Sequence, residues 1–177
     1  MKRALLALIG LLFLAQIASA QHSTPPSKSG PAPAPSSSSL AGDPRVRSRL
    51  IELGLTPNTD SDGDFKLILK TEGTRTQLAF AISKTNSYGS VEIREVWSPA
   101  FKTGGSLSAA MANRLLIENN KYKLGFWRLV GTGDSQVVIY AVQISADADA
   151  KSLEAALKTV TLIADDMEKE QLGTDDF

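Results

Sequence analysis

Apolar residues recur at every second position in three successive segments of the chain, which is the period of a β-strand with one buried face. The three segments begin near Phe65, Leu78 and Val91. Gly73 and Gly89 lie between them, and glycine is typical of the tight turns that join neighbouring strands. We therefore expect a meander of three antiparallel strands. In the second strand the larger apolar residues Leu78, Phe80 and Ile82 alternate with Gln77, Ala79 and Ala81.

Two further apolar segments, 124–130 and 136–144, are separated by a short turn that contains two glycines. Their spacing predicts a β-hairpin. Residues 137–142 are apolar on both faces of the second of these strands. This pattern is typical of a central strand that is covered on both sides, or of a strand whose outer face meets a partner.

Three segments show the spacing of amphipathic helices, with apolar residues three or four positions apart. The first follows Asp43-Pro44, the second spans 107–119, and the third spans 153–172. We expect Asp165, Asp166 and Glu168 on the solvent side of the third helix. The element order is then α-β-β-β-α-β-β-α, which predicts an α+β fold with a five-stranded antiparallel sheet and three helices.

The first 20 residues have the pattern of a secretory signal peptide: Lys2 and Arg3, an apolar run over 4–15, and small residues at Ala18 and Ala20. The sequence predicts cleavage after Ala20 and export to the periplasm or the extracellular space, with no stable membrane span in the mature chain. An uncleaved N-terminal anchor is the alternative.

The rest of the chain divides by composition. Residues 21–42 are rich in Pro and Ser and lack core-forming side chains, so they predict a disordered linker. Residues 43–173 contain all the predicted helices and strands and form one α+β domain. Residues 174–177 are expected to fray as a short tail.

Composition excludes several functional classes. The 177 residues include 19 Lys and Arg against 19 Asp and Glu, for a formal net charge of zero, which argues against nucleic-acid binding. The chain has no Cys, and its one histidine, His22, precedes the domain, so thiol- and histidine-dependent catalysis is excluded there. Residues 60–65 lack the glycine that a calcium loop needs at its sixth position and indicate a tight turn. No nucleotide-binding motif occurs, so we expect no metal, no cofactor and no enzymatic activity.

Five aromatic residues are candidates for binding a protein partner: Trp97, Tyr122, Phe126, Trp127 and Tyr140. Phe126 and Trp127 are adjacent on one strand and must point to opposite faces of the sheet. One of them therefore lies away from the main helix layer. Either a second helix or loop covers it, or it belongs to an apolar patch that binds a partner.

Two stretches, Glu95–Pro99 and Leu115–Phe126, resemble a strand end and a helix-to-strand junction of the YbjN family of bacterial sensory-transduction regulators. The acidic, alanine-rich segment Leu153–Leu172 is similar to the C-terminal helix of that family. The resemblance covers about Arg45–Gly173. It implies a fold like that of the Tir-type chaperones of type III secretion, which are non-enzymatic and usually dimeric. This chain differs from them in its signal peptide and linker.

Three functional hypotheses follow. The first is an exported protein-binding or regulatory module that uses an apolar sheet face or a helix groove. The second is a structural envelope domain that associates with itself. The third is a hydrolase that uses carboxylates alone, which needs two converging acidic side chains. The resemblance favours a homodimer whose interface includes 107–119 or the outer side of Trp127.

Overall fold

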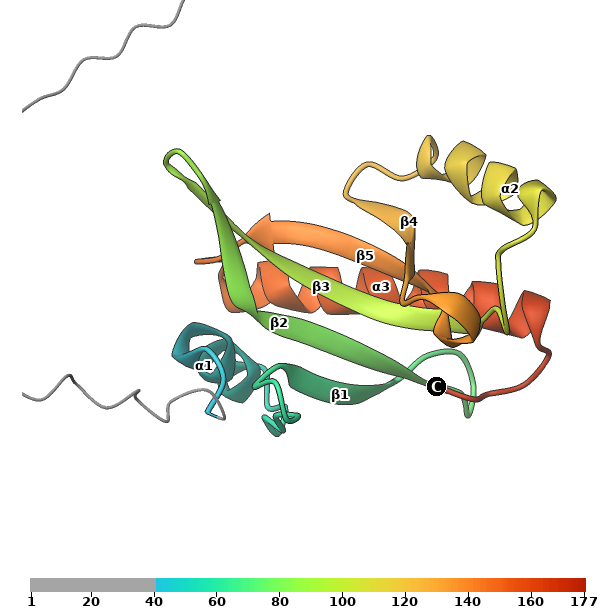
Figure 1. Ribbon diagram of the computed structural model, residues 1–177. Helices are drawn as coiled ribbons and strands as arrows, with labels where there is room; N and C mark the ends of the chain where they lie inside the picture. Colours follow the sequence, from blue (N-terminus) through green and yellow to red (C-terminus); the bar gives the residue numbers. More distant parts are fainter. Residues whose placement is uncertain (1–40) are drawn as a thin grey trace, which may run out of the picture. The chain divides into compact units, whose positions relative to one another are not determined.

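The computed structural model describes residues 41–177 (Figure 1). The predicted signal peptide and all but the last two residues of the predicted linker lie outside these described residues. The elements are α1 (Pro44–Glu52), β1 (Phe65–Lys70), β2 (Thr76–Tyr88), β3 (Val91–Lys102), α2 (Ala109–Asn119), β4 (Gly125–Val130), β5 (Val137–Ser145) and α3 (Ala150–Gln171). A 3-10 turn at Gly133–Ser135 joins β4 to β5.

The five strands form one antiparallel sheet in the order β1-β2-β3-β5-β4. The predicted element order and the predicted α+β class are confirmed. β5 pairs with both β3 and β4, so the strand that is apolar on both faces lies inside the sheet, as its sequence indicates.

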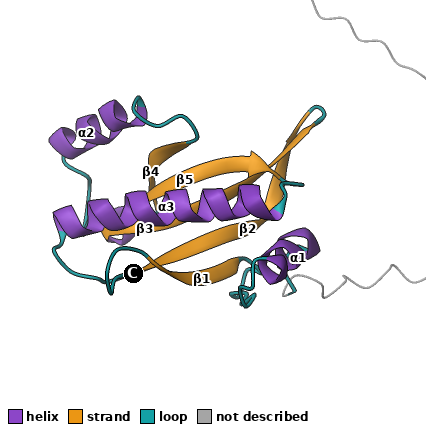
Figure 2. Ribbon diagram, turned by 180° about the vertical axis from the view of Figure 1, so that it is seen from behind, coloured by secondary structure: helices purple, strands orange, loops and turns teal. Residues whose placement is uncertain are grey.

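The α3 helix runs along one face of the sheet and packs against β2, β3 and β5 (Figure 2). The shorter α1 helix contacts α3 at one end of this layer. The α2 helix packs beside β4 instead of over the middle of the sheet. No helix within residues 41–177 is long and apolar enough to cross a membrane.

Small residues of β2 and β3 lie beneath α3. Ala79, Ala81 and Ala100 have no exposed surface and belong to the same core cluster as Leu157 and Val160 of the helix. Side chains of this size let the helix backbone come close to the sheet. The larger row of β2 (Leu78, Phe80 and Ile82) points to the opposite face, because side chains alternate along a strand.

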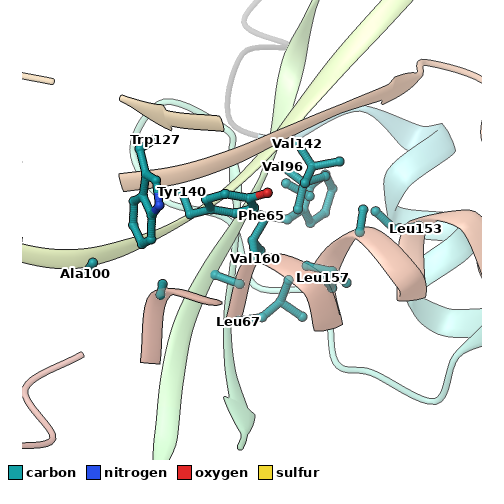
Figure 3. Packing of buried hydrophobic residues seen from close by; sticks show 14 of the residues in the cluster. Phe65, Leu67, Val96, Ala100, Trp127, Tyr140, Val142, Leu153, Leu157 and Val160 are labelled. Carbon is teal, nitrogen blue, oxygen red and sulfur yellow. The ribbon is translucent and has the colours of Figure 1, made fainter. Parts of the chain in front are cut away.

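Larger side chains from β1, β5 and α3 fill the rest of this core. Figure 3 shows Tyr140 and Trp127 at one end of it and Leu153 at the other, with Val160 and Leu157 between them. All of these residues are buried. The last helix therefore buries the apolar stripe that its sequence spacing predicts.

Two acidic residues of α3 do not lie where the sequence analysis expects them. Asp165 and Glu168 are buried, whereas Asp166 is exposed. Arg75, in the β1–β2 turn, donates from Nε to Asp165 Oδ1 at 2.6 Å and lies 3.5 Å from Glu168 Oε2. The positive charge of Arg75 thus offsets the cost of burying these two carboxylates. Arg75 lies far away along the chain, so the helical periodicity of α3 could not predict their burial.

The tail 174–177, which the sequence predicts to fray, turns back toward the same arginine. Arg75 Nη1 donates to the carbonyl of Thr174 at 2.8 Å, and the backbone N–H of Asp176 donates to Glu168 Oε1 at 2.5 Å. Lys102 lies over the ring of Phe177. These contacts connect the end of α3 to the first hairpin of the sheet.

A buried ion-pair network fixes α1 on the sheet. Asp43 caps the helix by accepting from the backbone N–H of Arg45 at 2.8 Å. Its Oδ2 also accepts from Arg94 Nη2 at 2.6 Å, and the Arg94 side chain is only 2% exposed. Arg45 in turn bonds Glu92 of β3 at 2.9 Å. Burial raises the pKa of Asp43, but hydrogen bonds from Arg45 and Arg94 outweigh it and lower that pKa to about 2.

The packing of α3 predicts opposite effects for two substitutions on that helix. Leu157 is only 1% exposed. Leu157→Ala should lower the free energy of unfolding by about 2–5 kcal/mol, because removing this buried side chain leaves a cavity between α3 and the sheet. Asp166→Ala, on the exposed side, should change it by less than about 0.5 kcal/mol. Urea unfolding measures both values. Equal effects would contradict the assigned helix face.

The Asp43 network predicts a pH dependence. Because folding lowers the Asp43 pKa from 3.8 to about 2, its stabilisation is complete above pH 3.8 and is lost as pH falls through about 2. Asp43→Asn keeps a capping side chain but removes the charge, so it should cost about 1–3 kcal/mol at neutral pH.

The difference in unfolding free energy between wild type and Asp43→Asn should shrink as pH falls from 4 to 2, as measured by urea unfolding at several pH values. Asp166→Asn, which changes an exposed acid on α3, is the matched control. If the Asp43→Asn variant differs from wild type by the same amount at pH 2 and pH 7, the role of the Asp43 charge is contradicted.

Candidate partner-binding face

The face of the sheet opposite α3 carries no α-helix in the described part of the chain (Figure 1). We call this surface the open face. Its apolar members are Ile68, Leu78, Phe80, Ile82, Trp97, Pro99, Phe126, Ile139 and Ala141. Each of them alternates along its strand with residues that face α3, which places them on this side.

An aromatic row crosses the middle of the open face. Phe80 pairs with Trp97, Trp97 with Ala141, and Ala141 with Phe126. The Phe80 and Trp97 rings are stacked with their centroids 4.2 Å apart. Ala141 and the neighbouring Ile139 are at most 1% exposed, because the larger side chains of the flanking strands close over them. The aromatic side chains themselves remain partly exposed.

Only two of the five aromatic candidates lie on the open face: Trp97 and Phe126, separated by Ala141. Trp127 and Tyr140 point to the α3 side, where they are at most 6% exposed. Tyr122 lies edge-on to Tyr140, with the ring centroids 5.0 Å apart.

Those three inward-facing aromatic residues hold α2 against the sheet. The Trp127 and Tyr140 rings pack edge to face at 5.1 Å, and Trp127 Nε1 donates to Glu118 Oε2 of α2 at 3.1 Å. Burial raises the pKa of Tyr140 to about 12. A Cβ at Gly125 would lie 2.6 Å from the Tyr140 ring, so only glycine fits there. These residues contribute to packing, and Trp127 also lines the groove between α2 and β4.

The sequence analysis does not single out Ile68, Phe80 or Ile139 as binding residues. Ile68 is 69% exposed although it lies in the middle of a strand. The alternation of large and small residues in β2 is the one sequence feature that could have identified this surface. It shows that the large residues are exposed only when α3 is known to cover the row of small residues.

Charged residues lie at the two lateral borders of the open face. Lys66 and Lys70, on β1, are exposed beside Ile68. Arg128 on β4 forms a two-pronged ion pair with Glu95 of β3, with distances of 2.5 and 3.0 Å. This surface is therefore largely apolar, with two lysines at its β1 border that pair with no acidic residue of 41–177 and an ion pair that runs from Arg128 on β4 to Glu95 on the central strand β3.

A second apolar surface lies at α2 and β4. A groove of about 430 Å³ between them is lined by residues that include Leu107, Leu115 and Leu129. Leu116 and Ile117, on the outer side of α2, are each 65% exposed. We call these exposed helix residues and the groove the α2 surface.

Acidic clusters offer less support for a metal or a hydrolytic site. Among residues 41–177, one group with metal-binding spacing stands out, formed by Asp165, Glu168 and Asp175. The guanidinium of Arg75 already lies among these carboxylates, within 3.9 Å of each of them. In the other cluster, Asp60 Oδ1 accepts from the backbone N–H groups of residues 62 and 64, which makes it the tight turn that its sequence favours.

Compared with models of known protein families and with curated protein sequences, the chain shows no significant match. The functional proposal therefore depends on the geometry of the open face and on the residues described above.

Proposed function

We propose that this protein is an exported, non-enzymatic module that binds another protein through the open face. One observation carries the proposal. In β2 the larger apolar side chains Leu78, Phe80 and Ile82 lie on the face without a helix, whereas Gln77, Ala79 and Ala81 lie beneath α3. Trp97 of β3 adds to the same open face, although its neighbour Val96 points into the α3-side core. An antiparallel sheet with one face in water ordinarily alternates apolar inward with polar outward.

The size of this surface gives a physical reason for binding. Five strands spaced about 4.8 Å apart, each about six residues long, span roughly 450–500 Å² in projection. This is the projected area of the whole face, including its charged residues and the buried Ile139 and Ala141, so the exposed apolar part is smaller. Contiguous exposed apolar patches of a few hundred Å² often bind partners. Burying apolar surface contributes about 25 cal/mol per Å² before the costs of association are subtracted.

The resemblance to the YbjN family supports a regulatory, non-catalytic role. It rests on the stretches Glu95–Pro99 and Leu115–Phe126, and the structure places residues of both at defined positions of the sheet. Trp97 lies on the open face, and Asn119 hydrogen-bonds to the edge of β4. Neither stretch forms a catalytic arrangement. The predicted signal peptide would deliver the domain to a partner outside the cytoplasm.

Site-specific photo-crosslinking in the producing cell tests the proposal. A photo-crosslinking amino acid replaces Ile68, which is 69% exposed on the open face, or Leu162, which is 51% exposed on α3. We expect a discrete adduct with another protein from position 68 and none from position 162. The captured protein, once purified, should bind wild type and Leu162→Asp equally well, and Ile68→Asp at least tenfold more weakly. Equal binding to all three would refute the open face as the site.

A second candidate function is structural self-association, and the α2 surface favours it. Leu116 and Ile117 are adjacent exposed apolar residues on a helix whose main packing partner is β4 and which also pairs Arg114 with Glu170 of α3. A second copy that covers them would form a homodimer. Light scattering at micromolar concentration should then give a dimer mass for wild type and a monomer mass for Leu116→Lys. A wild-type monomer mass that is unchanged on tenfold concentration would exclude this homodimer.

A further inference from the structure

The exposed edge of β4 is blocked to strand addition at one position. Asn119, at the end of α2, accepts a hydrogen bond from the backbone N–H of Trp127 at 2.7 Å and donates to its carbonyl at 3.5 Å. One side-chain amide thus occupies both backbone groups that an added strand would need at this position. A partner that extends the sheet at β4 would have to displace Asn119.

The opposite edge is partly covered. The backbone N–H of Lys66 donates to the carbonyl of Asn58 at 2.8 Å, so the preceding loop covers the start of β1. Where β2 continues beyond β1, the Ser83 N–H donates to Asp64 Oδ1 at 2.7 Å, and its carbonyl accepts from Arg94 Nη1 at 3.0 Å. An added strand would therefore meet occupied backbone groups at each edge, which disfavours sheet extension relative to docking on the open face.

The charges at its borders argue against a second copy on this face. A two-fold axis parallel to the strands would set Lys66 and Lys70 of one copy over Arg128 of the other. A two-fold axis across the strands would set the lysines over each other. The second arrangement brings lysines together, which disfavours association; in the first, Glu95 already neutralises Arg128, so the repulsion is weaker. Among the ion pairs of residues 41–177, Lys66 and Lys70 have no acidic partner within 4 Å.

The other face shows which element suits this sheet. There α3 lays an apolar stripe on the strands, and its flanking carboxylate Asp165 meets Arg75. A helix on the open face would complete a three-layer arrangement of helix, sheet and helix. Its apolar stripe would cover Trp97 and Phe80, and carboxylates beside the stripe would meet Lys66 and Lys70.

Building on the protein-binding function proposed above, we propose that the open face takes an amphipathic helix of a different protein, with carboxylates flanking its apolar stripe. The helix flank that lies over β1 should be acidic, because it would face the positive charges of Lys66 and Lys70. The occupied positions at both edges disfavour an added strand, and the lysines of β1, unpaired within the described residues, disfavour a second copy related by a two-fold axis across the strands.

Two synthetic 18-residue helical peptides test the inference. Both carry the same leucine and alanine stripe; one has glutamates on its flanks, the other lysines. Fluorescence anisotropy with the folded protein should show the glutamate peptide binding at least tenfold more tightly than the lysine peptide, and high salt should reduce that preference. Ile68→Asp should weaken binding of both peptides.

Charge reversal provides the decisive comparison. Lys66→Glu with Lys70→Glu should reverse the preference between the peptides. The control, Lys121→Glu with Lys123→Glu, changes two exposed lysines outside the open face by the same charge and should leave the preference in place. Circular dichroism and urea unfolding verify that both double variants are folded.

Each remaining outcome decides the question. Equal binding of the two peptides, or binding of neither, overturns the helix inference. Binding to phosphatidylglycerol vesicles is the third measurement. If wild type binds the vesicles more tightly than it binds the glutamate peptide, and Ile68→Asp abolishes vesicle binding, the open face binds a membrane surface and the helix inference is overturned. A crosslinked partner from position 68 together with failed peptide binding would leave the proposed function standing and remove only the helical, acidic occupant.

Discussion

The close packing of α3 on the small residues of β2 and β3 is the contact on which the rest of the structure depends. Ala79, Ala81 and Ala100 let the helix lie close to the sheet, and Leu157 and Val160 fill the space between them. Side chains alternate along a strand, so when the small residues of β2 face α3, its larger residues must point to the opposite face of the sheet. The apolar open face is thus a geometric consequence of how the core is built.

Polar groups inside the helix-side layer fix how the elements fit together. Gln77 donates to Ser98 Oγ at 3.1 Å, Arg94 pairs with Asp43, and Arg75 pairs with Asp165. An unpaired buried charge is costly, so each of these pairs disfavours other placements of its elements. The first joins two strands, the second joins α1 to β3, and the third joins the end of α3 to the first hairpin.

The two sides of the sheet therefore have different roles. One side buries Trp127 and Tyr140 to hold α2 and α3 in place. The other side leaves Trp97, Phe80 and Ile68 partly or largely exposed, with the lysines of β1 at one border. The edges of the sheet are occupied by Asn119 and by the loop before β1. A surface that is apolar on its face and blocked at some positions of its edges favours face-on docking over sheet extension.

Sequence periodicity alone determined the element order, the α+β class and the apolar stripe of α3, because these depend on local spacing. It also showed that Phe126 and Trp127 point to opposite faces. Only the tertiary structure decided which of them is exposed, because that depends on which row of β2 the distant α3 covers. The same holds for Asp165 and Glu168: their burial depends on Arg75, roughly ninety residues away along the chain. Local pattern specifies faces and periods, whereas long-range packing and charge pairing assign each face its neighbour.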